Sequence, residues 1–454
     1  MEPVALTTPR AHAMDCHDSE VNDMRKVWIS AVSVLGVLVS TAGAGAQVRA
    51  LTVDELVRLA LARNRDLLAT REQLAEARGL LRRAGVRPNP TVDIDYGSGE
   101  PLGSPGTTEL ALRYTHPIEL AGKRSKRQAV GQGGVAAAEA EYAARERQLV
   151  FDVTSRVADV RAAQAKTLAL AEVLAAGREA LRLTRARVSE GDVGSLEAQL
   201  LAVEVARVEA QHATFRGRST ALLSDLRRLV GVEAAEVPSV AAETAPGNDG
   251  ALALDELTTR ALKTRADLQA ARALEQQGAA ELALARAEGV PDLVASATYT
   301  QDTDTVDGLF AVTASGRPAP IVDDDKRFSV GVSIPLFWRG RNRGHVDAAL
   351  ARSTGARLHR EYLETAIARD VEAAYARWEA ARDTAAVFRQ GITTQADQNL
   401  ATMREAYTLG QLRLLDVLNE QRRLIELRLS QIDAETELAQ AAADLERAVG
   451  MDLP

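Results

Sequence analysis

The chain has 454 residues, a formal net charge of -8 and a sequence pI near 5.5, with 46% hydrophobic and 26% charged residues. This composition excludes an intrinsically disordered chain, and the lack of a basic excess argues against a nucleic-acid partner. Only 4% of the residues are aromatic, which favours Ala, Leu and Val packed along helix seams over one thick globular core.

The N-terminal 46 residues are predicted to be a secretory signal peptide. Met24, Arg25 and Lys26 form a basic start, residues 27–39 an apolar run, and 44–46 (Ala-Gly-Ala) a small-residue cleavage site. Residues 1–23 do not fit this plan, so we expect Met24 to be the true start; an uncleaved anchor is the alternative. Cleavage would remove Cys16, the single cysteine, and leave a mature chain without thiols.

The rest of the chain repeats one plan twice. The segment 53–67 recurs as 254–268 at an offset of 201, and the segment 225–231 recurs as 444–450 at an offset of 219. The sequence therefore predicts a first repeat over 47–231, a linker over 232–251 and a second repeat over 252–450. The extra residues of the second copy fall in the stretch 308–320.

Each repeat contains a long tract without proline, 118–237 in the first and 336–453 in the second. Because proline breaks helix interiors, these tracts permit long helices, and they are rich in the helix formers Ala, Leu, Glu and Arg. The first tract carries apolar residues seven apart, such as Val153, Val160, Leu174 and Leu181, a spacing typical of helices packed as a coiled coil. Glycines near the middle of each tract predict two helical hairpins, over 118–231 and 340–450.

Short segments of alternating polarity lie between the helices. They predict strands at about 91–98, 107–117, 292–301 and 326–336, each with one apolar and one polar face. A soluble half-buried sheet would show the same alternation, but the signal peptide favours strands in an outer membrane. Four strands leave two open edges, so they need partners from other chains, and three chains would form a 12-stranded barrel.

In order and spacing, residues 51–450 resemble the TolC family of outer-membrane efflux ducts. The resemblance rests on the opening segment 51–56, the strand exits at Pro117 and Pro335, segment 407–410 before 415–418, and the closing segment 445–450. It implies a mainly α-helical protomer with a small β part. Such protomers trimerise into a 12-stranded outer-membrane β-barrel on a periplasmic α-helical barrel. It also implies a passive channel, supplied by an inner-membrane RND pump through a periplasmic adaptor protein.

Two segments are similar to the branch of this family that serves heavy-metal cation efflux. They are 117–124 (Pro-Ile-Glu-Leu-Ala-Gly-Lys-Arg) and 335–344 (Pro-Leu-Phe-Trp-Arg-Gly-Arg-Asn-Arg-Gly). Heavy-metal cations are therefore the predicted cargo. Drug efflux and type I protein secretion remain open within transport, and a soluble periplasmic coiled-coil adaptor is the alternative from another class.

The resemblance also implies a pore gate where the hairpins turn. Asp416 matches an acidic ring that narrows the pore, Tyr407 matches a gate tyrosine, and Asn419 stands where some relatives have a second acidic residue. Leu412 replaces an arginine of some members, with Arg413 beside it. Glu197 is the counterpart of Asp416 in the first repeat and is predicted to face the same region; a solvated surface carboxylate is the alternative for both.

Two further groups are candidates for contacts outside the protomer. The hairpin turns resemble the tips that meet the adaptor, with candidate residues Glu190, Gly191, Asp192, Gly194, Gly410 and Gln411. Aromatic residues near the strand ends predict a girdle at the lipid interface, with ordinary strand packing as the alternative; they are Tyr96, Tyr114, Tyr299, Phe337 and Trp338. The basic cluster 123–127 is interpreted as a solvated helix start.

No chemistry of its own is predicted for the chain. The histidines, such as His116 and His212, are scattered without metal-ligand spacing, and we expect surface or packing roles for them. The sequence contains no constellation of nucleophile and base, no phosphate-binding glycine loop and no cofactor motif. We therefore expect neither an enzyme nor a bound cofactor.

Overall fold

The computed structural model describes residues 50–99, 106–232, 239–240, 253–336 and 342–451. Val48–Pro454 forms one compact unit, and the description that follows concerns this unit. The predicted signal peptide lies outside the described residues, as do Phe337 and Trp338 of the predicted girdle.

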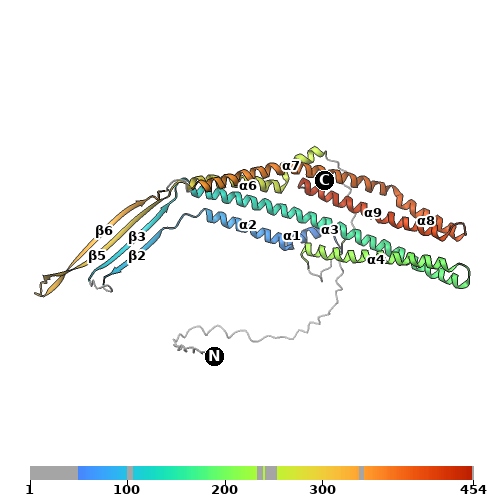
Figure 1. Cartoon of the computed structure of the whole chain (residues 1–454), viewed down its shortest axis with the longest axis horizontal. Helices are drawn as coiled ribbons and strands as arrows, with labels where there is room; N and C mark the ends of the chain where they lie inside the picture. Colours follow the sequence, from blue (N-terminus) through green and yellow to red (C-terminus); the bar gives the residue numbers. More distant parts are fainter. Residues whose placement is uncertain (1–49, 100–105, 233–238, 241–252, 337–341, 452–454) are drawn as a thin grey trace, which may run out of the picture. The chain divides into compact units, whose positions relative to one another are not determined.

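Both halves of the chain have the same order of elements: two helices, two strands and a long helical hairpin (Figure 1). The first half contains α1 (Val53–Arg63), α2 (Arg65–Ala84), β2 (Thr91–Ser98), β3 (Thr108–Ile118), α3 (Lys123–Glu190) and α4 (Ser195–Val230). The second contains α5 (Leu254–Thr264), α6 (Ala266–Glu288), β5 (Leu293–Val312), β6 (Pro318–Ser333), α7 (Arg343–Val387), α8 (Thr393–Thr408) and α9 (Leu414–Val449). The described chain is thus mainly helical with a small β part, which confirms the predicted fold class.

The helices pack along apolar seams instead of around one centre. Helix α3 contacts α2, α4, α6 and α9, and α7 contacts α6 and α9. The residues spaced by seven supply the seam between α3 and α4: Val153, Val160, Leu174 and Leu181 are all buried. Such narrow seams use small and branched side chains, which accounts for the low aromatic content.

A kinked helix pair lies against the end of a hairpin in each half. The kink between α1 and α2 is at Asn64, whose amide donates to the Leu229 carbonyl at 2.8 Å. In the second half the Thr264 hydroxyl donates to the Val449 carbonyl at 2.9 Å. Within two residues of these carbonyls the helices end at Gly231, with φ 74°, and its counterpart Gly450, with φ 81°. The repeated closing motif is therefore a left-handed helix cap packed on a kink.

The four long strands form one antiparallel sheet in the order β2-β3-β5-β6. The strands β3 and β5 join the two halves, with Tyr114 opposite Ala297 and Leu112 opposite Tyr299. The edges β2 and β6 have no strand partner within the described part of the chain. A separate parallel pair joins β1 (Ala50–Leu51) to β4 (Ser239–Val240), which lies in the predicted linker.

The structure differs from the sequence-based expectation at two places. The strands β5 and β6 extend to Val312 and from Pro318, well beyond the predicted 292–301 and 326–336 at that end, and β6 stops at Ser333. The stretch gained by the second repeat thus lengthens the hairpin. In addition, the outgoing arm of the second hairpin is interrupted at Phe388–Ile392, where Gly391 has φ 93°. The sequence does not predict this break, because a single glycine is also tolerated inside a continuous helix.

Candidate functional site

The sheet has one apolar face, and that face is exposed in the single chain. Directly opposite residues of antiparallel strands share a face, so Val92, Tyr114, Ala297 and Val330 lie on one side together. The side chain of Val330 is 76% exposed, and its neighbours along β6 are similarly uncovered. A contiguous exposed apolar surface of this kind is typical of a lipid or protein contact.

The predicted girdle tyrosines all lie on this apolar face, at three successive levels of the ladder. Tyr114 is level with Val92, Tyr299 with Leu112, and Tyr96 with Leu110. These levels are two residues apart along β3, and across β2, β3 and β5 the tyrosines lie in turn level with Leu110, Val92 and Leu112, so they form a staggered group on adjacent strands. The girdle itself stays a prediction.

The opposite face is rich in carboxylates towards the β5–β6 turn. Asp302 lies opposite both Glu109 and Asp325, and Asp304 lies opposite Asp323. Like charges placed directly opposite each other destabilise a sheet, so this arrangement does not serve folding. The carboxylates of this face are Asp93, Asp95, Glu109, Asp302, Asp304, Asp323 and Asp325, beside the two arginines Arg113 and Arg327.

An ion pair between a buried lysine and a half-buried aspartate connects the sheet to the helices. Lys123, the first residue of α3, is 7% exposed, and its Nζ lies 2.7 Å from Oδ1 of Asp292, next to the start of β5. The Leu120 N–H donates to the same oxygen at 3.0 Å. Desolvation acts to raise the pKa of Asp292, but the bonds from Lys123 and Leu120 hold it below the usual value.

The basic cluster 123–127 is therefore not the solvated helix start that the sequence predicted. Arg124 donates to the Gly85 carbonyl at 2.7 Å, and Arg127 pairs with Glu119. Asn342, the counterpart of Arg124 at an offset of 218, donates to the Ala285 carbonyl at 2.7 Å. In both repeats a hydrogen bond thus joins the start of the long helix, α3 or α7, to the end of the preceding helix, α2 or α6. These tertiary partners, distant in sequence, bury charges that a helix N-terminus alone would leave in water.

The two hairpin turns meet through a hydrogen bond between predicted gate residues. The Tyr407 hydroxyl donates to Oε2 of Glu197 at 2.8 Å, which joins α8 to α4. Burial and then the neighbouring Glu197 carboxylate raise the pKa of Tyr407 above its usual value, so the hydroxyl is protonated at neutral pH. The sequence indicated both residues for this region, but not that they bond to each other.

Asp416 and Asn419 are exposed on the first turns of α9. Oδ2 of Asp416 accepts a hydrogen bond of 3.3 Å from the Arg413 N–H, so this carboxylate also caps its own helix. The residues of the two turns that were predicted to meet an adaptor are all exposed: Glu190, Gly191, Asp192, Gly194, Gly410 and Gln411.

A charged residue of this region was not singled out from the sequence. Glu204 of α4 is 2% exposed, and its Oε1 lies 2.5 Å from NH2 of Arg207 on the same helix. Its Oε2 lies 2.8 Å from NH2 of Arg422 on α9. Desolvation acts to raise the pKa of Glu204, but the two arginines bring it below the usual value, so the group is an anion at neutral pH. In the sequence the residue looks like an ordinary surface glutamate, since its α9 partner is 218 residues away.

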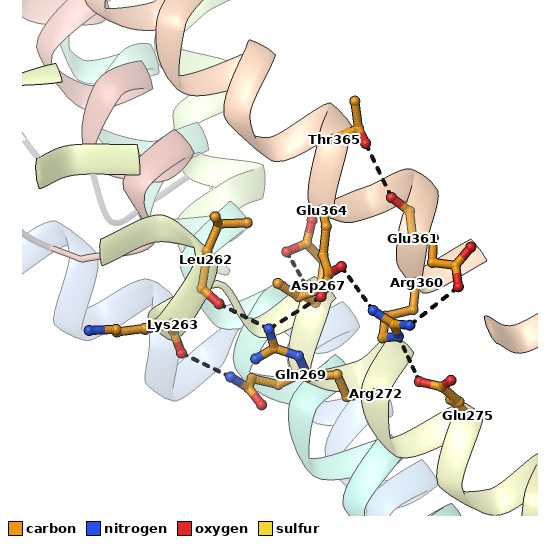
Figure 2. Close-up of polar contacts among 11 residues, drawn as sticks. Leu262, Lys263, Asp267, Gln269, Arg272, Glu275, Arg360, Glu361, Glu364 and Thr365 are labelled. Carbon is orange, nitrogen blue, oxygen red and sulfur yellow. Dashed lines mark hydrogen bonds and ion pairs between the residues drawn. The ribbon is translucent and has the colours of Figure 1, made fainter. Parts of the chain in front are cut away.

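The second half also contains an ion network in which two of the charged positions have uncharged counterparts in the first half. Figure 2 shows Arg360 of α7 between Glu275 of α6, at 2.7 Å, and Glu364 of its own helix, at 2.8 Å. At the equivalent positions of the first half stand Leu74 and Tyr142, in place of Glu275 and Arg360. The network joins α6 to α7 at the surface, where each ion pair contributes little stability.

The described residues contain neither a cluster of metal ligands nor a membrane-spanning helix. Among them, no group of three or more His, Cys, Asp or Glu side chains is arranged to hold a metal ion. None of the helices in the described ranges is long and apolar enough to cross a membrane.

The duplicated protomer, with its two-faced sheet and meeting hairpins, defines the class of the protein. The model of the outer membrane efflux protein family matches residues 56–232 and 257–451, and the chain belongs to this family. It is 26% identical over 406 residues to the cobalt-zinc-cadmium resistance protein CzcC of Cupriavidus metallidurans, with 88% of this chain and 90% of that protein covered.

Solved structures with the same fold come from other channels. The outer membrane channel CmeC of Campylobacter jejuni superposes with a TM-score of 0.72 at 16% identity, covering 88% of this chain and 85% of that one. CusC, described as forming a transmembrane channel, superposes with a TM-score of 0.71 at 19% identity, covering 88% and 92%.

The family assignment confirms the predicted resemblance and location. The protein is an outer-membrane efflux protein with a periplasmic helical extension, and not an enzyme. The soluble periplasmic adaptor considered from the sequence is thereby excluded.

Proposed function

We propose that the protein is the outer-membrane duct of a tripartite heavy-metal efflux system. It would passively conduct cations that an inner-membrane RND pump and a periplasmic adaptor deliver. The observation that carries this proposal is the pairing of an apolar sheet face with an opposite face of seven carboxylates and two arginines. An acidic water-filled lumen concentrates cations, and the similarity to a cobalt-zinc-cadmium resistance protein supports metals as the cargo.

The open edges of the sheet support a homotrimer. Backbone groups in lipid must all be hydrogen-bonded, yet β2 and β6 lack a strand partner within the described chain. Three copies joined edge to edge would give twelve strands with the apolar face outwards, in contact with outer-membrane lipid. The carboxylates would then line the lumen.

We place the gate at the hairpin turns, on Asp416, Tyr407, Asn419 and Glu197. Three copies would bring three Asp416 carboxylates around one axis and favour cations at the constriction. The bond between Tyr407 and Glu197 would hold the two hairpins of each protomer together, and outward movement of the turns would open the pore. The exposed turn residues from Glu190 to Gly194, with Gly410 and Gln411, would contact the adaptor.

The lumen assignment is tested by neutralising carboxylates on one face of one strand. We expect D323N/D325N to lower the preference for Zn²⁺ over Cl⁻, measured as the reversal potential of single channels in planar bilayers under a ZnCl₂ gradient. D324N is the matched control, because Asp324 lies between them on the other face of β6. Equal selectivity in the double variant, the control and wild type would remove the acidic face from the cation path.

The gate assignment is tested in the same bilayers. We expect D416A to reduce cation preference, and unchanged selectivity would remove Asp416 from the gate. Removal of the Tyr407 hydroxyl in Y407F should raise the conducting fraction about fivefold, since one hydrogen bond of about 1 kcal/mol is lost. A conducting fraction that stays at the wild-type level would contradict the assignment of Tyr407. A channel that passes antibiotics but shows no cation preference would favour drug efflux instead.

A further inference from the structure

The least exposed charged residue of the described chain lies between the two hairpins and has no place in the gate assignment. Glu204 of α4 is enclosed by Arg207 of its own helix and Arg422 of α9. Arg422 donates through Nε to Oε2 of Glu204 at 2.8 Å, and its NH2 also lies 2.8 Å from this oxygen in an ion pair. A buried carboxylate needs such partners, because leaving it unpaired is costly.

The contact between these hairpins is otherwise apolar around this point. Leu418 and Ile425 of α9 are buried in one cluster with Leu201, Val205 and Val208 of α4. Separation of α9 from α4 would therefore uncover apolar surface and break the bond to Arg422 together. Arg207 would stay with Glu204, since the two residues share α4 and are three positions apart.

Other polar contacts show how far the first hairpin holds α9. Gln440 donates to Asp159 of α3 at 2.8 Å, and Asp433 pairs with Lys166 of α3. Both contacts lie between Arg422 and the C-terminal end of α9. Among the described residues, the next polar contact with the first hairpin, from Asp433 towards the turn, is made by Arg422. The contact after it is made by Tyr407 on α8.

The interruption between α7 and α8 lies beside the part of α9 around Gln431, close to Asp433. The Thr393 hydroxyl, directly after Phe388–Ile392, is 2.7 Å from Oε1 of Gln431 on α9. Gly391, inside the interruption, has φ 93°, a conformation that favours glycine. Helix α3, the equivalent arm of the first hairpin, continues without a break from Lys123 to Glu190. The second hairpin thus has a helix break in its outgoing arm, at the level of α9 between the contacts made by Asp433 and Arg422.

From these contacts we propose that Glu204 is a positioning residue of the gate. Its ion pair with Arg422, called the clasp below, keeps the turn segment from Thr393 to about residue 430 against α3 and α4. The proposal rests on the proposed function, because the movement it restrains is the opening of the hairpin turns. During that movement Arg422 leaves, and Arg207 remains as the counter-ion of Glu204, so the buried charge is never unpaired. The clasp can therefore open and close without a large barrier from an isolated charge.

The test compares two arginine-to-methionine variants of α9 in the full chain reconstituted in planar bilayers. R422M removes the clasp, whereas R428M removes an arginine whose partner, Asp397 of α8, belongs to the same hairpin. We expect the conducting fraction to rise about tenfold in R422M and to stay at the wild-type value in R428M, since only Arg422 crosses to α4. E204Q, which keeps the shape but removes the charge, should rise in the same direction. Equal conducting fractions in R422M, R428M and wild type would overturn the proposal.

A second measurement is independent of conduction. In a C16S background, L418C places a thiol at a site that is 2% exposed between α9 and α4, and V449C places one at the far end of α9. We expect R422M to speed maleimide labelling at residue 418 about tenfold and to leave residue 449 unchanged. Faster labelling at residue 418 without any conduction in bilayers would support the Glu204–Arg422 contact and refute the channel. Conduction with unchanged labelling at residue 418 would refute the clasp and retain the channel.

Discussion

The left-handed glycine caps at the ends of the hairpins allow a quantitative test of how the helices pack. Gly231 and Gly191 both end a helix with positive φ, at 74° and 86°. A Cβ on Gly231 would lie 2.7 Å from the Arg63 carbonyl oxygen and 2.9 Å from its carbon, whereas a Cβ on Gly191 would meet nothing within 4 Å. The two positions therefore share the backbone strain of an alanine and differ only in the clash.

We expect G191A to cost about 1–2 kcal/mol of unfolding free energy, from the left-handed backbone alone. G231A should cost about 1–3 kcal/mol more, because the α1–α2 kink must move to admit the methyl group. The measurement is loss of far-UV circular dichroism during denaturation of the detergent-extracted protein, with both variants under the same conditions. Equal destabilisation by the two substitutions would refute the packing of the hairpin end on the kink at Asn64.

Two further predictions concern the sheet and its junction. V330R should block stable insertion of the protein in the outer membrane, since an arginine facing lipid costs about 2–4 kcal/mol. S329R, on the opposite face of the sheet, should insert normally. Equal yields of the two variants in outer-membrane fractions would contradict the assignment of faces. For the pair Lys123–Asp292, the pKa of Asp292 is lower in the folded chain than in the unfolded one, so its stabilising effect is present at neutral pH and lost as pH falls through the folded value. D292N should thus be less stable than wild type at pH 7 and approach it below about pH 4; a constant difference over this range would contradict the linkage.

The sequence predicts the parts of this protein that repeat or alternate locally. The apolar positions Val92, Ile94 and Tyr96 are enough to place β2, and residues spaced by seven are enough to place α3. The outer part of β5 was not predicted, because its Asp and Thr residues have little strand signal alone; they are ordered by pairing with 318–325 across the hairpin.

In the candidate site, too, the sequence indicates residues with a local pattern and misses those that depend on distant partners. The family resemblance indicates Tyr407 and Glu197 for one region, but their bond depends on how α8 lies against α4. Glu204 and Lys123 resemble surface charges in the sequence, and each becomes buried only through a partner in the other half of the chain. Charges buried by distant partners leave no local pattern, which is why sequence reasoning missed them.

The mass of the detergent-extracted complex shows whether three copies of the chain build the outer-membrane channel. The full chain would be expressed in a Gram-negative host, the envelope fractionated, and the detergent-solubilised protein measured by light scattering. We expect a heat-sensitive complex of three chains in the outer-membrane fraction. A monomer or dimer, or protein released to the periplasm without detergent, would contradict it.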